Sequence, residues 1–239
     1  MPDNALYLAK FGRKEHLESI KRGYLFFNPI SKYRDDTSAF RGDKFEGMVP
    51  IDPSTMSIGS GGKEWFTDLG VPRPVSAFSY FQNDEKRFIF CAAMITKEVS
   101  VKMSKSEFAL GKSFKNSVRQ FGDYVLLFSA NEINHRLHTN ANVKFRQIGF
   151  ESGPIIYRDL SIFSGDYHTA YSITNCDSDR YFVKDKKYKD QNEWRILIDG
   201  YYQHLEPNCG EGYSLFVGEL EWAYLFETAT FLETLLWKE

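Results

Sequence analysis

The chain has 239 residues, of which 42% are hydrophobic, so it can bury one sizeable core or two small ones. Its 30 basic and 32 acidic side chains give a formal net charge of -2, which argues against a general polyanion binder, because that class carries a basic excess. The three cysteines, Cys91, Cys176 and Cys209, are widely spaced and form no CxxC pair, which argues against a disulfide framework or a cysteine zinc site and favours a reducing, cytoplasmic location.

No linker rich in proline, glycine or serine divides the sequence, so we expect one domain over residues 1–239. The first residues lack an apolar stretch behind basic residues, and we expect no signal peptide. No apolar run approaches the ~20 residues that a membrane span needs, so we expect no membrane partner.

The first elements are expected to be strands at 5–11 and 24–28, with a short helix at 13–23 between them. Basic residues in the last turn and Gly23 after it are typical of a helix C-terminus. The polar segment 31–74 has little periodicity, and so long a stretch in a compact domain predicts a functional loop.

A buried strand at 87–95 is the clearest pattern of the middle of the chain. Further elements are expected in this order: a helix at 105–122, a helix opened by a capping box from Ser129 to Glu132, a hairpin of 143–150 with 153–159, and strands at 193–199 and 213–220. Strands and helices alternate without βαβ regularity. The predicted fold is therefore α+β, with mostly antiparallel central sheets and flanking helices.

Two opposite charges, Glu193 and Arg195, stand at the entry of the strand 193–199. Apolar residues on both faces from position 196 onward predict a central strand, where unpaired charge is costly. Alternation places the two charges on one face, roughly 6–7 Å apart along the strand. They form either a local ion pair at a strand end or a catalytic carboxylate that a guanidinium orients beside a cleft.

A second candidate group lies in the loop 31–47. Its polar side chains include Tyr33, Arg34, Arg41, Asp43 and Glu46. The loop is either an ordinary solvated segment or part of the same site, because Tyr-Arg beside a strand end and Asp-x-x-Glu-Gly after Arg-Gly are unusually specific patterns. We expect it to fold toward Glu193.

Other familiar site patterns are weak or absent. His135 and His138 are spaced i, i+3 on a predicted helix without a third ligand, which favours an ordinary helix surface over a metal site. The sequence has no GxSxG, HExxH or GxGxxG, and its glycine-rich stretch at 57–65 lacks the phosphate-loop spacing.

The order LYLAKF, HLESIKRGYLFFNPISKYRD, RGDKFEG and KYKDQNEWRI resembles a large, poorly characterised family of bacterial and phage-encoded proteins. The opening strand, the helix after it and a glutamate on a late strand are also similar, more distantly, to ADP-ribosyltransferases, above all the toxins that modify DNA bases. The likeness implies an ADP-ribosyltransferase-like fold with NAD as substrate.

The resemblance also implies roles for particular residues. In that superfamily a strand-borne glutamate, often preceded two residues earlier by Gln or Glu, binds the nicotinamide-side ribose and stabilises an oxocarbenium-like transition state. Gln191 and Glu193 match that pattern. By the same resemblance, catalysis is assigned to Glu193 together with Arg41 and Arg195. NAD binding is assigned to Gln191 together with Tyr7, Lys10, Tyr33 and Arg34. The superfamily's first-strand His or Arg would fall near Tyr7 to Lys10, where this sequence has no histidine.

The implied activity is NAD-dependent mono-ADP-ribosyl transfer by a bacterial toxin or phage-defence effector. Its acceptor would be nucleic acid or protein, and an antitoxin or chaperone would be a possible partner. One alternative is a nuclease that uses Asp43, Glu46 and Glu193 around Mg²⁺, because this ion prefers oxygen ligands. Another is a non-catalytic interaction module of a toxin–antitoxin or defence system.

Overall fold

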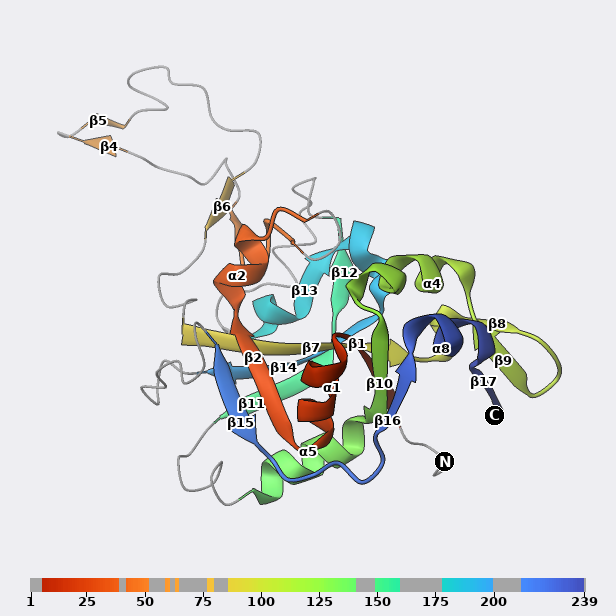
Figure 1. Cartoon of the computed structure of the whole chain (residues 1–239). Coiled ribbons are helices and arrows are strands. Elements are labelled where there is room, and N and C mark those ends of the chain that lie inside the picture. Colours follow the sequence, from red (N-terminus) through yellow and green to blue (C-terminus); the bar gives the residue numbers. More distant parts are fainter. Residues whose placement is uncertain are drawn as a thin grey trace.

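The structure, a computed structural model, describes residues 6–38, 42–51, 59–60, 63–64, 77–79, 86–140, 149–159, 178–199 and 212–238. Within these ranges, a central sheet of eight strands dominates the molecule (Figure 1). Its strands are β1 (Tyr7–Gly12), β2 (Tyr24–Pro29), β7 (Arg87–Ile95), β10 (Tyr124–Ser129), β11 (Phe150–Pro154), β14 (Glu193–Asp199), β15 (Tyr213–Phe216) and β16 (Tyr224–Glu227).

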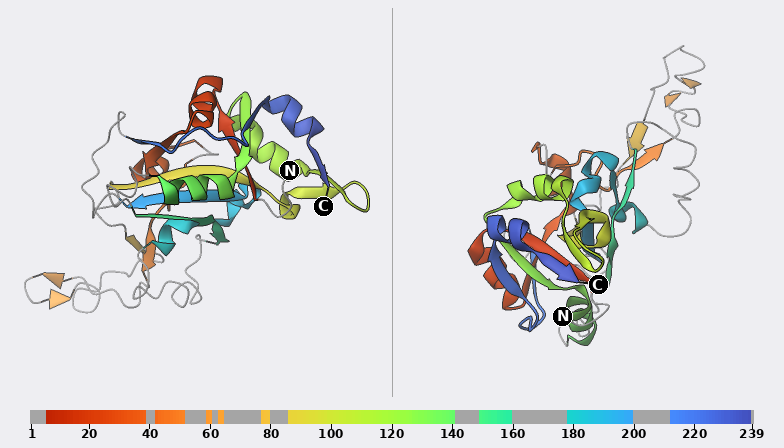
Figure 2. Two further views of the ribbon diagram at one scale, coloured as in Figure 1. Left: turned by 90° about the horizontal axis from the view of Figure 1, so that it is seen from below. Right: turned by 90° about the vertical axis from the view of Figure 1, so that its right-hand side faces the viewer.

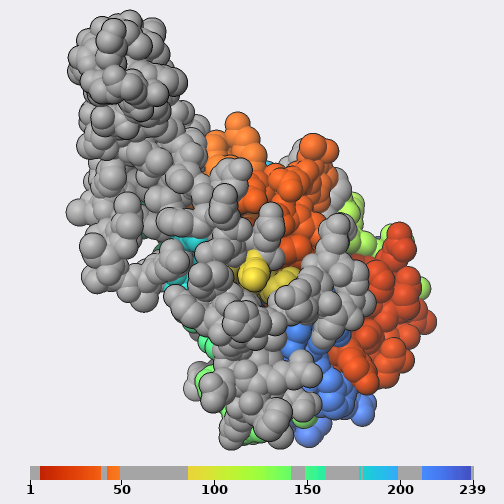
Figure 3. All heavy atoms as spheres, turned by 90° about the vertical axis from the view of Figure 1, so that its left-hand side faces the viewer, coloured from red at the N-terminus to blue at the C-terminus, as the bar shows by residue number. Residues whose placement is uncertain are grey.

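The strand order is β11-β14-β7-β1-β10-β16, and β2 pairs with both β7 and β15. Every pairing in this sheet is antiparallel. The pairing of β15 with β2 places C-terminal residues (blue) beside N-terminal ones (red and orange) in the space-filling view (Figure 3). Strand β7 has β14 along one edge, whereas β1 and β2 share its other edge.

Smaller sheets surround the central one. They are formed by β8 (Ser100–Lys102), β9 (Glu107–Leu110) and β17 (Leu236–Lys238), by β3 (Val49–Ile51) with β6 (Ala77–Ser79), by β4 (Gly59–Ser60) with β5 (Lys63–Glu64), and by β12 (Ile156–Arg158) with β13 (Val183–Asp185). The last pair is parallel.

The described helices are short. The α-helices are α1 (Lys14–Lys21), α2 (Ile30–Asp35), α4 (Lys112–Val118), α5 (Ala130–Thr139) and α8 (Thr228–Thr234), and the 3₁₀ helices are η3 (Lys97–Val99), η4 (Arg119–Phe121), η5 (Asp179–Phe182) and η6 (Lys186–Gln191). None of them has the length and apolar character that crossing a membrane requires.

Alternation along the central strands separates two sides of the sheet. On one side, Trp194, Ile196 and Ile198 of β14 join a large core to which α1 and α5 contribute. On the other side, β1, β7 and β10 pack with α4 and α8, and Leu197 of β14 packs with Tyr181 in a smaller cluster. Helices therefore cover both sides of the sheet (Figure 2). Glu193 and Arg195 share the side of Leu197.

The structure confirms the α+β class with mostly antiparallel sheets. It confirms the strands at 87–95 and 193–199 with the predicted bounds, and it places β14 between β11 and β7, as expected of a central strand. The side chain of Ser129 accepts a hydrogen bond from the backbone N–H of Glu132 at 3.4 Å, as the capping box predicts.

Two expectations are wrong, and a third falls largely outside the described residues. The predicted helix at 105–122 begins as β9, because Phe108 and Leu110 alternate inward, and α4 starts only after Gly111. The predicted hairpin does not form in the described residues: β11 pairs with β14 and β12 with β13, while residues 143–148 lie outside them. The segment 31–74 is not only loop, because α2 opens it directly after Pro29, a residue compatible with a helix start.

Candidate functional site

The carboxylate of Glu193 lies at the entry of β14 and is held on both oxygens. Its Oε1 accepts a hydrogen bond from Nε of Arg195 at 2.5 Å, and its Oε2 accepts one from Nζ of Lys184 at 2.8 Å. The backbone N–H of Glu193 donates to the hydroxyl of Tyr157 at 2.8 Å, and its carbonyl accepts from the backbone N–H of Ile155 at 2.9 Å. Neither the backbone nor the side chain of Glu193 can move independently of its neighbours.

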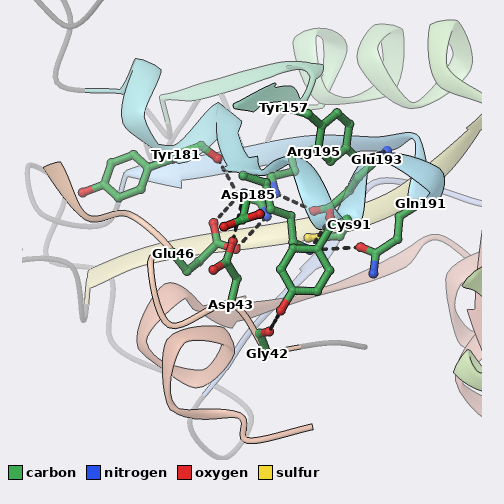
Figure 4. A network of polar contacts seen from close by, with 12 residues as sticks. Gly42, Asp43, Glu46, Cys91, Tyr157, Tyr181, Asp185, Gln191, Glu193 and Arg195 are labelled. Carbon is green, nitrogen blue, oxygen red and sulfur yellow. Dashed lines mark hydrogen bonds and ion pairs between the residues drawn. The ribbon is translucent and has the colours of Figure 1, made fainter. Parts of the chain in front are cut away.

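The guanidinium of Arg195 joins two carboxylates (Figure 4). Besides Glu193, it binds Glu46 through both Nη atoms, with Nη2 to Oε2 at 2.9 Å, and Nη1 also donates to the carbonyl of Tyr181. Arg195 and Glu46 are each 1% exposed. Burying such charges is costly unless they are paired and saturated with hydrogen bonds, and this arrangement meets both conditions. The interpretation as an ion pair is therefore correct for the geometry of Glu193 and Arg195.

Lys184 completes the charge balance of the network. Its Nζ donates to Oε1 of Gln191 at 3.1 Å as well as to Glu193, and its side chain is 4% exposed. Lys184 and Arg195 carry two positive charges against the two negative charges of Glu46 and Glu193. We call these four residues with Gln191 the charge network. It joins the loop 42–47, the segment 180–191 and strand β14.

Asp43 and Gly47 explain the rest of the Asp-x-x-Glu-Gly motif. The two carboxylate oxygens of Asp43 accept hydrogen bonds from the backbone N–H groups of Phe45, at 3.1 Å, and Asp185, at 3.2 Å. Gly47 has a φ of 68°, a left-handed conformation that favours glycine, and its carbonyl accepts from Arg180 at 3.1 Å. Asp43 and Gly47 therefore shape the turn that delivers Glu46 to Arg195.

The electrostatics keep Glu193 and Lys184 ionised. Burial opposes ionisation of Glu193, but Arg195 and Lys184 outweigh it and hold the pKa of the carboxyl well below its usual range. Burial likewise opposes the charge on Lys184, yet Glu193 raises the pKa of the ammonium above its ordinary value. For Glu46, burial raises the pKa against the pull of Arg195. Glu193 is consequently an anion and Lys184 a cation at neutral pH.

Tyr33 and Cys91 border the network as neutral groups. Burial, followed by the nearby Cys91, raises the pKa of the Tyr33 hydroxyl, which accepts a hydrogen bond from Nδ2 of Asn28 at 3.2 Å. Burial and the adjacent Glu193 raise the pKa of the Cys91 thiol to about 12. Cys91 is therefore a protonated thiol and not a nucleophile at neutral pH.

The predicted first-strand residues, Tyr7 and Lys10, make contacts of their own. Lys10 lies over the ring of Phe90, with Nζ 4.9 Å from its centroid, and donates to the carbonyl of Cys91. Cys91 lies between the residues of β7 that pair with β1 and those that pair with β2, so this bond is made between the two pairings. Tyr7 packs against the second core. Neither contact involves the carboxylate of Glu193.

Among the predicted site residues, the structure brings Glu193, Arg195 and Gln191 together and places Tyr33 beside them. Arg34 lies on α2 next to Tyr33, with Nε 3.9 Å from the carboxylate of Asp35. Arg41 lies outside the described residues. Within those residues, no group of three His, Cys, Asp or Glu side chains is placed to hold a metal ion. His138 is bonded to its own helix, with Nδ1 2.8 Å from the carbonyl of Asn134.

Sequence reasoning missed Lys184 and Tyr157. Lys184 was visible only as one of a cluster of lysines, whereas its place directly after the apolar pair Phe182-Val183 was a usable signal of burial. Nothing local marked Tyr157, which reaches Glu193 from another strand.

No protein-family model, no curated protein and no solved structure matches the chain. The site is consequently interpreted from its own geometry.

Proposed function

We propose that the protein is an ADP-ribosyltransferase-like enzyme that transfers ADP-ribose from NAD and uses Glu193 as its catalytic carboxylate. The acceptor is nucleic acid or protein, in keeping with a toxin or phage-defence effector. The observation that carries the proposal is an ionised carboxylate at the first residue of a central strand, with one oxygen oriented by Arg195 and the other by Lys184.

This geometry suits the transition state of ADP-ribosyl transfer. As the bond to nicotinamide breaks, positive charge develops on the ribose, and a fixed anion stabilises that charge without having to reorganise. Each carboxylate oxygen has two acceptor positions, so Oε2 can accept from a ribose hydroxyl in addition to Lys184. Gln191 and Glu193 meet on the ammonium of Lys184, which supports a common role for the Gln-x-Glu pattern.

The same contacts speak against the Mg²⁺ nuclease. Both oxygens of Glu46 accept from Arg195, and both oxygens of Asp43 accept from backbone N–H groups. A cation at Glu46 would lie beside the positive charge of Arg195, which repels it.

The proposal is tested by incubating the protein with labelled NAD and a bacterial lysate. We expect label to appear on nucleic acid or protein with the wild type, and to be strongly reduced with Glu193→Gln. Digestion of the labelled product with nuclease or protease identifies the class of acceptor. Cleavage of nucleic acid that needs Mg²⁺ but no NAD would instead support the nuclease.

A second candidate, the non-catalytic interaction module, is favoured by one observation. The side chain of Glu193 is only 8% exposed, and both of its oxygens already have partners. In that case the charge network only fastens three segments of the chain together. Absence of label with every acceptor fraction, from protein that melts cooperatively, would favour this candidate.

A further inference from the structure

The residue before Glu193 has an unusual backbone. Asn192 has φ 45° and ψ 54°, and it is the only non-glycine residue with positive φ in the described part of the chain. Asparagine tolerates this left-handed conformation better than most residues. The turn occurs where η6 ends and β14 begins, so it decides how the chain enters the central strand.

Asn192 also completes the pairing of β14 with β7. Its carbonyl accepts from the backbone N–H of Met94 at 2.7 Å, as in an antiparallel pair. The left-handed turn directs its own N–H to the carbonyl of Lys189 at 3.1 Å. The side-chain Nδ2 takes the place of that N–H, because it donates to the carbonyl of Met94 at 2.9 Å and to Oγ1 of Thr96 at 3.0 Å.

These contacts let the chain pair with β7 and turn back at the same residue, which a regular strand could not do. Backbone pairing with Met94 is kept, which holds Glu193 opposite Ala93 in the register. The chain nevertheless turns back, so that Gln191 reaches Lys184 beside Glu193. A shift of register by one residue would move Glu193 to the opposite side of the sheet.

We propose that Asn192 is a positioning residue for the site, whose side-chain amide fixes the orientation of the Glu193 carboxylate toward Lys184 and Arg195. Both properties are needed. Glycine can adopt the turn but offers no amide, and aspartate can adopt it but has no N–H to donate to Met94. Where activity is the readout, the inference rests on the proposed transferase function.

The test compares Asn192→Gly and Asn192→Asp with the wild type. Asn140→Gly is the matched control, because Nδ2 of Asn140 also donates to a backbone carbonyl, that of Phe216 at 2.9 Å, far along the chain from Glu193. The first readout is the titration of the Glu193 carboxyl by NMR, assigned with Glu193→Gln. The second readout is the steady-state kinetics of transfer, which give kcat and KM for NAD.

We expect the titration midpoint of Glu193 to move up toward that of an ordinary carboxyl in both Asn192 variants and to stay unchanged in Asn140→Gly. The value of kcat should fall about tenfold or more with KM nearly unchanged, because misplacement of a catalytic group affects the reacting geometry. If Asn192→Gly leaves both the titration and kcat at wild-type values, the proposal is overturned. Failure of Asn192→Gly to fold would assign the residue to folding alone and would overturn it as well.

The two proposals can fail separately. If the wild type transfers no ADP-ribose, the transferase function fails, whereas the titration of Glu193 still decides whether Asn192 orients the carboxylate.

Discussion

The buried charge of Arg195 is compensated by Glu46 as well as by Glu193. The guanidinium is 1% exposed and is compensated by two carboxylates, one of which comes from a loop 149 positions earlier in the chain. Removing either partner leaves buried charge without full compensation, which costs far more than the loss of an exposed pair.

Glu46→Gln should therefore lower the free energy of unfolding by about 3 kcal/mol or more. Glu233→Gln is the control, since Glu233 pairs with Arg119 and Lys115 through a side chain that is 62% exposed. It should change stability by less than about 1 kcal/mol. Urea unfolding measures both, and equal losses in the two variants would contradict the account of the charge network.

The low pKa of Glu193 links stability to pH. A carboxyl whose pKa is lower in the folded than in the unfolded chain contributes stability that is fully present above the unfolded pKa, about 4.3 for glutamate. That contribution is lost as the pH falls toward the folded pKa. The difference in unfolding free energy between wild type and Glu193→Gln should therefore shrink from pH 7 to pH 3. The difference cancels the carboxyls that do not interact with Glu193, and a constant difference would refute the assignment.

Two glycines join β2 to the segment after β15. Gly23 has φ 93° and Gly218 has φ 89°, and a Cβ at Gly23 would lie 2.1 Å from the carbonyl oxygen of Gly218. The carbonyl of Gly23 accepts from the N–H of Val217 at 2.8 Å. Gly23 therefore serves both as the residue that ends α1 and as the close contact that holds β2 against the C-terminal part of the sheet.

Gly23→Ala should destabilise the protein by more than about 1 kcal/mol, because it combines an unfavourable φ with a backbone clash. Gly12→Ala should have a much smaller effect, since a Cβ there would meet only Leu17 at 3.7 Å. Thermal melts of the two variants decide this, and similar melting temperatures would count against the proposed role of Gly23.

The elements that could be predicted are those in which the local sequence pattern and the packing in the folded chain favour the same structure. Most of residues 87–95 and all of residues 193–198 are buried, so their apolar runs identified the two strands from sequence. Residues 107–110 alternate in burial, and pairing with β8 and β17 decides their structure as strand. The partner of β11 is likewise set by contacts with β14, a strand about forty positions away that no turn signal reveals.

The candidate site was predictable in part for the same reason. Charge at the mouth of a buried strand marked Glu193 and Arg195, because unpaired charge there is costly. The sequence pattern could not show that Glu46 and Lys184 are the compensating partners, since these residues meet β14 only in the folded chain. The roles of Asp43 and Gly47 also required the fold, which shows a turn where the motif suggested a ligand.

The molecule as a whole brings three distant segments to one end of a rigid strand. The loop 42–47, the segment 180–191 and β14 meet in the charge network (Figure 4), while the large core lies on the other side of the sheet. A charge-balanced, buried arrangement of this kind is suited to holding one carboxylate in a fixed orientation. In the proposed transferase this carboxylate, Glu193, acts on charge that develops during transfer from NAD.

The most direct measurement is the single-turnover rate of ADP-ribosyl transfer, together with the NAD dissociation constant, for wild type and Glu193→Gln. Glutamine keeps the shape and an acceptor oxygen but removes the charge. We expect the rate to fall by about 10²–10³. The dissociation constant should change little, because the charge acts mainly in the transition state. Equal transfer rates in the two proteins, both shown to be folded by thermal melts, would contradict the account and leave Glu193 as part of a structural ion pair only.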